Sequence, residues 1–466
     1  MKFKMIWFGP EDESSGQPSV QLEPPKASDK QSPGRYGQDG PGMVRQEQLR
    51  NGRIKITAIA NFTAVIRRDI VCDDDEQPTR AFGIEAEVGG RKCAFVLPVT
   101  EFGSMNWVLR ELGPQAIVYP GQHQHARAAI QYLSTDVGRE NIFTHLGWRK
   151  HGSGWIYLHA GGVLGPAGRL ADWHVRLPLP LQNYRMCPPA GADTKVKAVR
   201  SSLGLLSVAP DRISLPLLAA IYRAPLGAVD FGVFVTGRTG TFKTALAALC
   251  QQHFGAAMDA SGLPGNFAST PSALEELAFA AKDALMVVDD FAPTGAVGDS
   301  TLYAVAERLF RSAGNQQGRS RMRGQQHLDG CRFPRGMLLA TGEEMPRGHS
   351  LRARLLILQV KPGEVDLTAL SECQQAAHSG LFARAMAAYL EWISARYDRL
   401  QECLRARVIE LRQRVHPVPA SFHPRLPTTL SELQAGLEKS GCNSPSKLAP
   451  SPKSREGSYS TELAPL

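Results

Sequence analysis

One segment limits the possible folds of this chain more than any other, and it spans residues 231–249, FGVFVTGRTGTFKTALAAL. An apolar strand pattern leads into a loop with two glycines, a lysine and a threonine, and an apolar helix pattern follows, which is the context of a phosphate-binding loop. Loop amides and the helix N-terminus surround an anion, the lysine reaches the terminal phosphates, and the threonine hydroxyl coordinates magnesium. The residues expected to bind ATP with Mg²⁺ are Gly237, Arg238, Thr239, Gly240, Thr241, Phe242, Lys243 and Thr244.

The loop departs from the usual pattern at one position, because Phe242 stands where a glycine ordinarily precedes the lysine. An amide at that position can still donate to a phosphate, but a large ring now lies beside the loop. Either the pocket is reshaped or the ring packs underneath. The alternative interpretation is an ordinary strand-to-helix turn with a surface lysine.

A second apolar segment ends in two carboxylates, in the sequence ALMVVDDFAP at residues 284–293. A carboxylate at the carboxyl end of a buried strand beside a phosphate loop can hold magnesium through water, and its neighbour can orient or deprotonate the attacking water. We assign Asp289 to magnesium, together with Thr244, and Asp290 to the base. Many ATPases of this type carry glutamate instead of Asp290, and two aspartates after a strand also suit a helix cap or a solvated turn.

Two further segments supply candidate catalytic residues. RGMLLATGEE reads as a strand that ends in Thr341, Glu343 and Glu344, and Thr341 is the candidate to sense the γ-phosphate or the attacking water. SLRARLLILQV places Arg352 and Arg354 before the last strand of the core. One of these arginines can serve as a finger that enters the site of a neighbouring subunit, or both are solvated arginines without a catalytic part.

The alternation of short apolar strands with amphipathic helices from residue 231 to residue 360 predicts an α/β fold, a P-loop NTPase with a parallel sheet covered by helices. Short β-branched and aromatic runs precede it. The expected organisation is a disordered tail at 1–51, a β-rich domain at 52–190, the P-loop core with a helical lead-in at 191–362, a helical region at 363–440 and a disordered tail at 441–466. That last tail is also consistent with truncation of a longer ancestor.

Composition narrows the setting of this 466-residue chain. Its eight cysteines form no C-x-x-C pair, which excludes a zinc ribbon and favours a reducing compartment. The apolar runs are far shorter than the ~20 residues of a membrane span, so we expect a cytoplasmic protein without a membrane partner. The net charge of +9 is compatible with a polyanionic partner. Arginines concentrate in residues 308–335, and those assigned to a nucleic-acid backbone are Arg319, Arg321 and Arg323.

Taken together, the segments THLGWRKHGSGWIYLHAGG, FVTGRTGTFKTALAAL, NFASTPSALEELAFAAKDALMVVDDFAP and LLATGEEMPRGHSLRARLLIL resemble the bacterial ATPases that carry domain of unknown function 927. The resemblance covers roughly residues 55–440. Such proteins are commonly encoded on mobile elements and phages and are similar to primase-associated helicases. The resemblance implies a P-loop core with an additional strand, of the AAA+ or superfamily 3 helicase kind. It further implies that the protein forms a homo-oligomer, for which a ring is one possible arrangement, and that it couples ATP hydrolysis to work on DNA.

Two other functional classes stay open at this point. The first is a nucleotide-switched protein for DNA binding or assembly, in which ATP controls the state and no strands are separated. The second is a non-catalytic nucleic-acid-binding module with a degenerate loop, suggested by Phe242 and by aspartate rather than glutamate at Asp290.

Overall fold

The computed structural model describes residues 35–166, 168–170, 173–188, 191–293, 295, 299–318, 321–323, 327–329, 332–415 and 423–439. The chain forms two compact units. One unit holds the described residues of Met1–Val65, Glu85–Cys93 and Ser104–Thr135. The other holds those of Ile66–Ile84, Ala94–Gly103 and Asp136–Leu466.

The second unit is built on a five-stranded sheet whose paired strands all run parallel, in the order β14-β15-β18-β13-β19. The strands are β13 (Gly232–Thr236), β14 (Gly265–Asn266), β15 (Leu285–Phe291), β18 (Met337–Gly342) and β19 (Leu355–Gln359). Strand β18 lies between β13 and β15, which precede it in the chain. The additional strand predicted for the P-loop core is therefore present.

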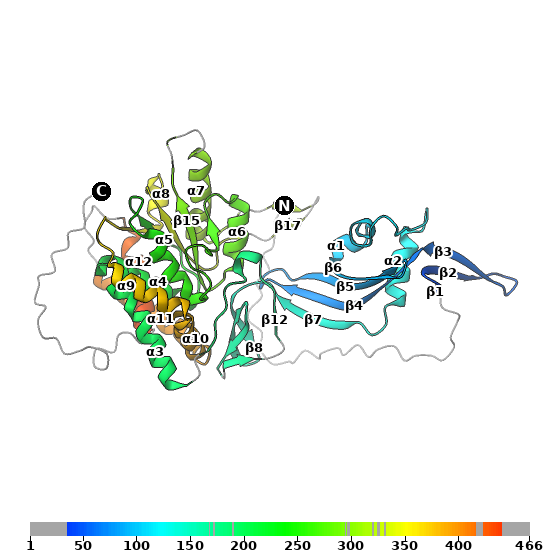
Figure 1. The fold of residues 1–466 in the computed structure, drawn as a ribbon, viewed down its shortest axis with the longest axis horizontal. Helices are drawn as coiled ribbons and strands as arrows, with labels where there is room; N and C mark the ends of the chain where they lie inside the picture. Colours follow the sequence, from blue (N-terminus) through cyan, green and yellow to red (C-terminus); the bar gives the residue numbers. More distant parts are fainter. Residues whose placement is uncertain are drawn as a thin grey trace, which may run out of the picture. The chain divides into compact units, whose positions relative to one another are not determined.

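Helices cover this sheet because its strands are apolar on both faces. All five residues of β13 are buried, and Phe310 of helix α7 contacts Phe234 and lies against Gly232 on one face of that strand. Figure 1 shows α5, α6 and α7 grouped around β15. The helices of the core are α5 (Lys243–Gln251), α6 (Pro271–Ala280), α7 (Asp299–Asn315) and α8 (His349–Arg352). The predicted α/β fold class is confirmed.

A second set of helices packs together in the same unit, with α3 against α10 and α12 against both α4 and α11. These helices are α3 (Ala192–Leu203), α4 (Asp211–Arg223), α9 (Leu367–His378), α10 (Leu381–Ser394), α11 (Tyr397–Val415) and α12 (Leu426–Lys439). The predicted helical C-terminal region is thus present. Residues 441–466 lie outside the described part of the chain.

The remaining elements are mostly strands. An antiparallel sheet contains β8 (Gly147–His151), β9 (Gly154–His159), β10 (Gly162–Gly165) and β11 (Gly168–Leu170), and a mixed sheet has the order β12-β7-β4-β5-β6. Its strands are β4 (Phe62–Asp73), β5 (Thr79–Val88), β6 (Arg91–Pro98), β7 (Gly138–Phe143) and β12 (His174–Val175). The short helices are α1 (Val99–Phe102), α2 (His123–Leu133), η1 (Val108–Leu112), η2 (Leu179–Leu181), η3 (Gly204–Ser207), η4 (Ala224–Leu226) and η5 (Gln252–Phe254).

The expected tail at 1–51 is wrong for its last part. Strands β1 (Tyr36–Asp39) and β2 (Gly42–Gln48) pair antiparallel, and β2 also pairs with β3 (Ile54–Ala60). Met43 and Val44 of β2 are buried. Burial of these two apolar side chains stabilises the strand although the segment around them is polar and contains glycines. Residues 1–34 lie outside the described residues.

The structure also divides the chain differently from the boundary expected at residue 190. Trp148 of β8 is fully buried and donates from Nε1 to the carbonyl oxygen of Pro225 over 2.6 Å. Tyr157 of β9 donates from its hydroxyl to the carbonyl oxygen of Asp283 over 2.8 Å. The aromatic side chains of residues 147–159 therefore belong to the same hydrophobic core as the strands of the parallel sheet.

Candidate functional site

The loop between β13 and α5 is tightly fitted to the sheet. A Cβ on Gly237 would lie 2.4 Å from the carbonyl oxygen of Val360, so only glycine fits there. Gly240 has φ of +81°, a conformation that other residues rarely adopt. The Thr241 hydroxyl donates to the carbonyl oxygen of Arg238 over 2.8 Å and closes the loop on itself.

Phe242 takes the backbone conformation that glycine usually supplies at this position. Its φ and ψ are +63° and +24°, and it stands directly before the first residue of α5. This left-handed conformation costs an ordinary residue about 1–2 kcal/mol. The side chain is 44% exposed, so the ring does not pack underneath the loop. The loop thus keeps a glycine-like backbone at the expense of strain.

The lysine of the motif folds over the same loop. Lys243 Nζ donates to the carbonyl oxygen of Arg238 over 3.0 Å. This hydrogen bond holds the ammonium beside the loop, where the phosphates of a nucleotide would bind. Because α5 begins at Lys243, the amides of its first turn have no partner inside the helix and favour an anion.

Three elements converge on the carboxylate of Asp289 near the end of β15. The Thr244 hydroxyl of α5 donates to Asp289 Oδ1 over 3.0 Å, and the Thr341 hydroxyl near the end of β18 donates to the same oxygen. Hydroxyl and carboxylate oxygens suit a hard cation such as Mg²⁺, which keeps several waters and takes further oxygens from phosphates. The described residues contain no group of three or more His, Cys, Asp or Glu placed for a metal. One carboxylate and two hydroxyls fit a magnesium ion that takes further oxygens from a bound nucleotide.

Asp290 lies in an irregular part of β15. Its φ is +69°, and the pairing of β15 with β18 shifts register between Val288 and Phe291. The Asp290 amide donates to Thr341 Oγ1 over 3.2 Å, so one hydroxyl links both aspartates. The irregularity places one extra residue in β15 directly after the contact between Asp289 and Thr244.

The sequence pattern indicates no role for Glu343, whose side chain the structure brings to the loop. Thr239 Oγ1 donates to Glu343 Oε1, and the carbonyl oxygen of Glu343 accepts from Thr236 Oγ1 over 3.3 Å. The available signal was its position, two residues after Thr341 at the end of a core strand.

Arg354 lies at the opposite end of the parallel strands from the loop. The Gly232 amide donates to the carbonyl oxygen of Arg354 over 2.9 Å, so Arg354 stands at the beginning of β13, whereas the loop follows its end. At about 3.3 Å per residue the five-residue strand separates these ends by about 15 Å. Arg354 Nη2 donates to Asn315 Oδ1 over 2.6 Å and Arg352 Nε to the carbonyl oxygen of Pro346 over 3.2 Å. The structure therefore does not bring Arg354 to the site of its own chain.

The arginine segment at 319–323 is described only in part. Arg321 and Arg323 belong to β16 (Arg321–Arg323), which pairs antiparallel with β17 (His327–Asp329), and Arg319 lies outside the described residues. This hairpin connects α7 with β18.

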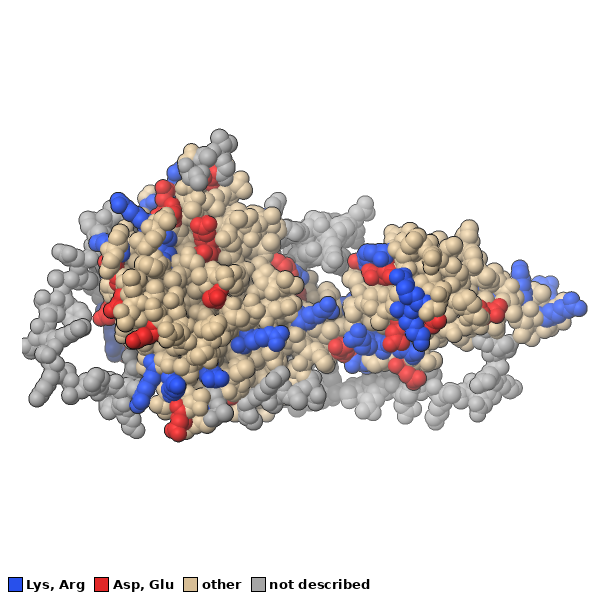
Figure 2. Space-filling view, in the orientation of Figure 1, with Lys and Arg blue, Asp and Glu red and all other residues tan. Residues whose placement is uncertain are grey.

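The wider basic stretch at 308–335 is less available for phosphates than its composition suggests. Arg308 forms a two-point ion pair with Glu275, and Arg311 pairs with Glu307 over 2.8 Å. Arg335 is buried, and its guanidinium lies 3.7 Å from the ring centroid of Phe279. Figure 2 shows acidic side chains interspersed among the basic ones on the face in view. A count of arginines along the sequence could not show which of them already have acidic partners.

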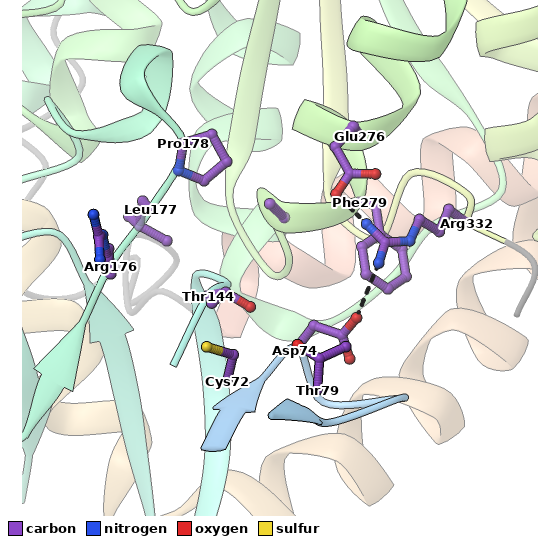
Figure 3. A pocket seen from close by; sticks show the side chains of 11 residues that line it. Cys72, Asp74, Thr79, Thr144, Arg176, Leu177, Pro178, Glu276, Phe279 and Arg332 are labelled. Carbon is purple, nitrogen blue, oxygen red and sulfur yellow. Dashed lines mark hydrogen bonds and ion pairs between the residues drawn. The ribbon is translucent and has the colours of Figure 1, made fainter. Parts of the chain in front are cut away.

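Four basic side chains of this unit pair with one acidic segment, Asp73–Glu76, which begins at the last residue of β4. The pairs are Asp73 with Arg149 (2.8 Å), Asp74 with Arg332 (3.3 Å), Asp75 with Lys282 (2.8 Å) and Glu76 with Arg335 (3.9 Å). A cavity of about 320 Å³ adjoins this segment, and Figure 3 shows Arg332 crossing the ring of Phe279 between Glu276 and Asp74. The charges of Arg332, Asp74 and Glu276 are thus satisfied within the protein.

His125 and three tryptophans are engaged in contacts within the protein. His125 hydrogen-bonds Tyr36 over 3.0 Å and Arg45 over 2.7 Å, which leaves neither ring nitrogen for a metal. Trp148 is part of the core, while Trp155 donates to Asp398 over 3.0 Å and Trp173 stacks on Phe143. In the described residues, no helix has both the length and the apolar character required to cross a bilayer.

No family model matches the sequence, and no curated protein matches it. The assignment to the family of domain of unknown function 927 therefore stays a prediction. Among solved structures, the active helicase titled SCCmec type IV Cch is 13% identical, with a TM-score of 0.50 over 88% of this chain and 74% of that one. The JCV helicase is 16% identical (TM-score 0.26; 48% of this chain, 65% of that one), and the C-terminal region of NrS-1 is 9% identical (0.26; 78% and 85%). The fold of this chain is that of a P-loop, helicase-like α/β protein.

Proposed function

We propose that this protein is a magnesium-dependent ATPase and a helicase- or translocase-like motor that acts on the DNA of a mobile element or phage. One observation carries the proposal: the Asp289 carboxylate accepts hydrogen bonds from the hydroxyls of both Thr244 and Thr341. That contact joins the phosphate loop, strand β15 with the paired aspartates, and the additional strand β18. These parts meet at the carboxyl ends of the parallel strands, where α/β proteins bind ligands.

Each residue then has a part in phosphoryl transfer. The loop amides from Gly237 to Thr244 cradle the phosphates, and Lys243 pairs with the terminal ones. Thr244 and Asp289 would hold magnesium, which neutralises the charge that develops on the phosphates. Thr341 and Asp290, linked through the Thr341 hydroxyl, orient the attacking water. Positioning and charge neutralisation supply most of the rate in this chemistry.

The position of Arg354 supports a homo-oligomer. Arg354 lies at the end of the strands away from its own loop, so as an arginine finger it would act on a neighbouring subunit. A ring in which each subunit presents this end to the loop of the next would satisfy the requirement. The β16 and β17 hairpin, with Arg321 and Arg323 in β16, is our candidate for contact with a DNA backbone.

The test is the ATPase rate of the full chain, with and without single-stranded DNA, at about 50 and 200 mM salt. We expect magnesium-dependent hydrolysis that DNA stimulates several-fold, and a smaller stimulation at the higher salt because counterion release weakens phosphate contacts. Absence of ATP binding would overturn the proposal. Hydrolysis that ignores DNA, together with an oligomer size that ATP controls, would instead favour a nucleotide-switched assembly protein.

A further inference from the structure

Glu343 is fixed in place by the two strands on either side of it. Its amide donates to the carbonyl oxygen of Phe291 at the end of β15 over 2.9 Å, and its carbonyl oxygen accepts from Thr236 at the end of β13. The preceding Gly342 leaves no room for a side chain, since a Cβ there would lie 2.7 Å from the Phe291 oxygen. The backbone of Glu343 is therefore bound to both of the strands that carry the candidate site.

The side chain of Glu343 reaches the phosphate loop itself. Its carboxylate accepts the hydrogen bond of the Thr239 hydroxyl, in the middle of the loop. Glu343 is exposed, and no lysine or arginine among the described residues pairs with it. A carboxylate without a cation beside a triphosphate is a costly arrangement, because like charges repel. It becomes useful when a water molecule lies between the carboxylate and the γ-phosphate.

The neighbouring Asp290 is less suited to that position. Its side chain is one methylene shorter, its backbone is turned by the irregularity in β15, and its amide is already bonded to Thr341. Within the described part of the chain, no donor hydrogen-bonds the Asp290 carboxylate. By contrast, the Glu343 carboxylate already lies against the loop.

We propose that Glu343 is the catalytic base of the proposed ATPase, so this inference rests on that function. The Glu343 carboxylate accepts one proton from the attacking water as the water oxygen bonds to the γ-phosphorus. The bond from the γ-phosphorus to the bridging oxygen breaks, and its electron pair leaves with ADP. The proton then passes to the released phosphate or to solvent, which regenerates the carboxylate. Asp290 orients the water.

The first test compares steady-state kinetics of the full chain and three variants, Glu343→Gln, Asp290→Asn and Glu344→Gln. We expect Glu343→Gln to lower kcat about 10²–10³-fold, as loss of a general base does, with no increase in KM. Asp290→Asn should lower kcat less. Glu344, the adjacent exposed glutamate, accepts a 3.4 Å hydrogen bond from Tyr303 and is the matched control, with activity within about twofold of wild type.

The second test measures binding without turnover, by competition of a non-hydrolysable ATP analogue and of ADP against a fluorescent nucleotide. Removing a charge beside the γ-phosphate should tighten binding of the triphosphate analogue by about threefold and leave ADP binding unchanged in Glu343→Gln. An equal effect on both nucleotides, or a kcat loss in Asp290→Asn as large as that in Glu343→Gln, would overturn the assignment of the base. The proposed function would survive that result, and it fails only if the wild-type chain neither binds nor hydrolyses ATP.

Discussion

The Thr244 hydroxyl lies 3.0 Å from Oδ1 of Asp289, although 44 residues separate the two in sequence. The contact forms because α5 begins directly after the loop and because β15 runs in the same direction as β13, the strand that leads into the loop. Parallel strands place their carboxyl ends at one edge, so residues from distant segments meet there. The Thr341 hydroxyl donates to the same carboxylate and completes the link.

Replacement of Asp289 by Asn should uncouple nucleotide binding from magnesium. An amide is a much weaker ligand for a hard cation than a carboxylate. The NH2 group of asparagine is also a hydrogen-bond donor, as is the Thr244 hydroxyl that donates to Asp289 in wild type. In wild type, we expect added magnesium to tighten ATP binding, and in Asp289→Asn we expect that gain to be lost. Titration of a fluorescent ATP analogue with magnesium or with EDTA measures the difference. A variant that retains the full gain would contradict the assignment.

Replacement of Lys243 by Ala should abolish hydrolysis while the fold is retained. The ammonium donates to the Arg238 carbonyl oxygen at the partly exposed surface of the loop, so its removal leaves no buried group without a partner. We expect kcat to fall by about 10²–10³-fold or more, as it does when other groups that stabilise charge in a transition state are removed. Lys195→Ala, which removes a surface lysine paired with Glu391, is the control. Unimpaired turnover in Lys243→Ala would refute the phosphate-binding role of the loop.

The sequence was sufficient to predict the sheet and the loop, because these depend on local patterns of apolar residues and glycines. It could not show what Phe242 does, since a backbone conformation with positive φ leaves no mark when a residue other than glycine adopts it. Nor could it assign Glu343, whose contact with Thr239 depends on two strands that meet only in the folded sheet.

Substitutions at Phe242 should affect stability through the backbone rather than through the ring. Glycine relieves about 1–2 kcal/mol of left-handed strain, partly offset by its greater entropy in the unfolded chain. Valine, which tolerates this conformation even less, should lower the free energy of unfolding. We therefore expect the order of melting temperature to be Phe242→Gly at or above wild type, and Phe242→Val below it. A Val variant as stable as wild type would show that position 242 is not left-handed.

The average composition of a segment does not show which of its residues find partners in distant segments. The arginines at 308–335 look like a phosphate-binding stretch in sequence, yet Arg308, Arg332 and Arg335 have acidic or aromatic partners from distant segments. Likewise, the polar composition of residues 36–48 concealed two strands that Met43 and Val44 anchor. In both cases a few long-range contacts outweigh the average character of the segment, and these contacts cannot be read from a window of sequence.

Mixing of subunits should reveal an arginine finger that acts between them. Asp289→Asn removes the magnesium carboxylate but leaves the arginines, whereas Arg354→Ala leaves the nucleotide site. Each variant alone should be inactive in a homo-oligomer. A mixture should recover part of the activity, because an intact Arg354 can then face an intact site in the next subunit. The same mixture with Arg352→Ala identifies which arginine acts, and no recovery with either would contradict action between subunits.

The buried imidazole of His253 should make stability depend on pH. Burial lowers the pKa of His253 from 6.5 to about 4, and its Nδ1 and Nε2 already bond the Leu249 carbonyl oxygen and the Ser202 hydroxyl. A depressed pKa in the folded state means that the unfolded chain binds the proton more tightly. His253 therefore adds stability above pH 6.5 that is lost as the pH falls from 6.5 to 4, at up to about 3 kcal/mol.

His145, also buried with a pKa lowered to about 4 by burial, acts in the same direction, so the wild-type slope has two sources. Urea unfolding at several pH values between 4 and 7.5 measures that slope. Replacement of His253 by Asn should lower stability at pH 7.5 and remove roughly half of the loss between pH 6.5 and 4. The Asn variant loses the titrating imidazole while the His145 contribution persists. A slope unchanged in His253→Asn would show that His253 is not the buried neutral group that the structure presents.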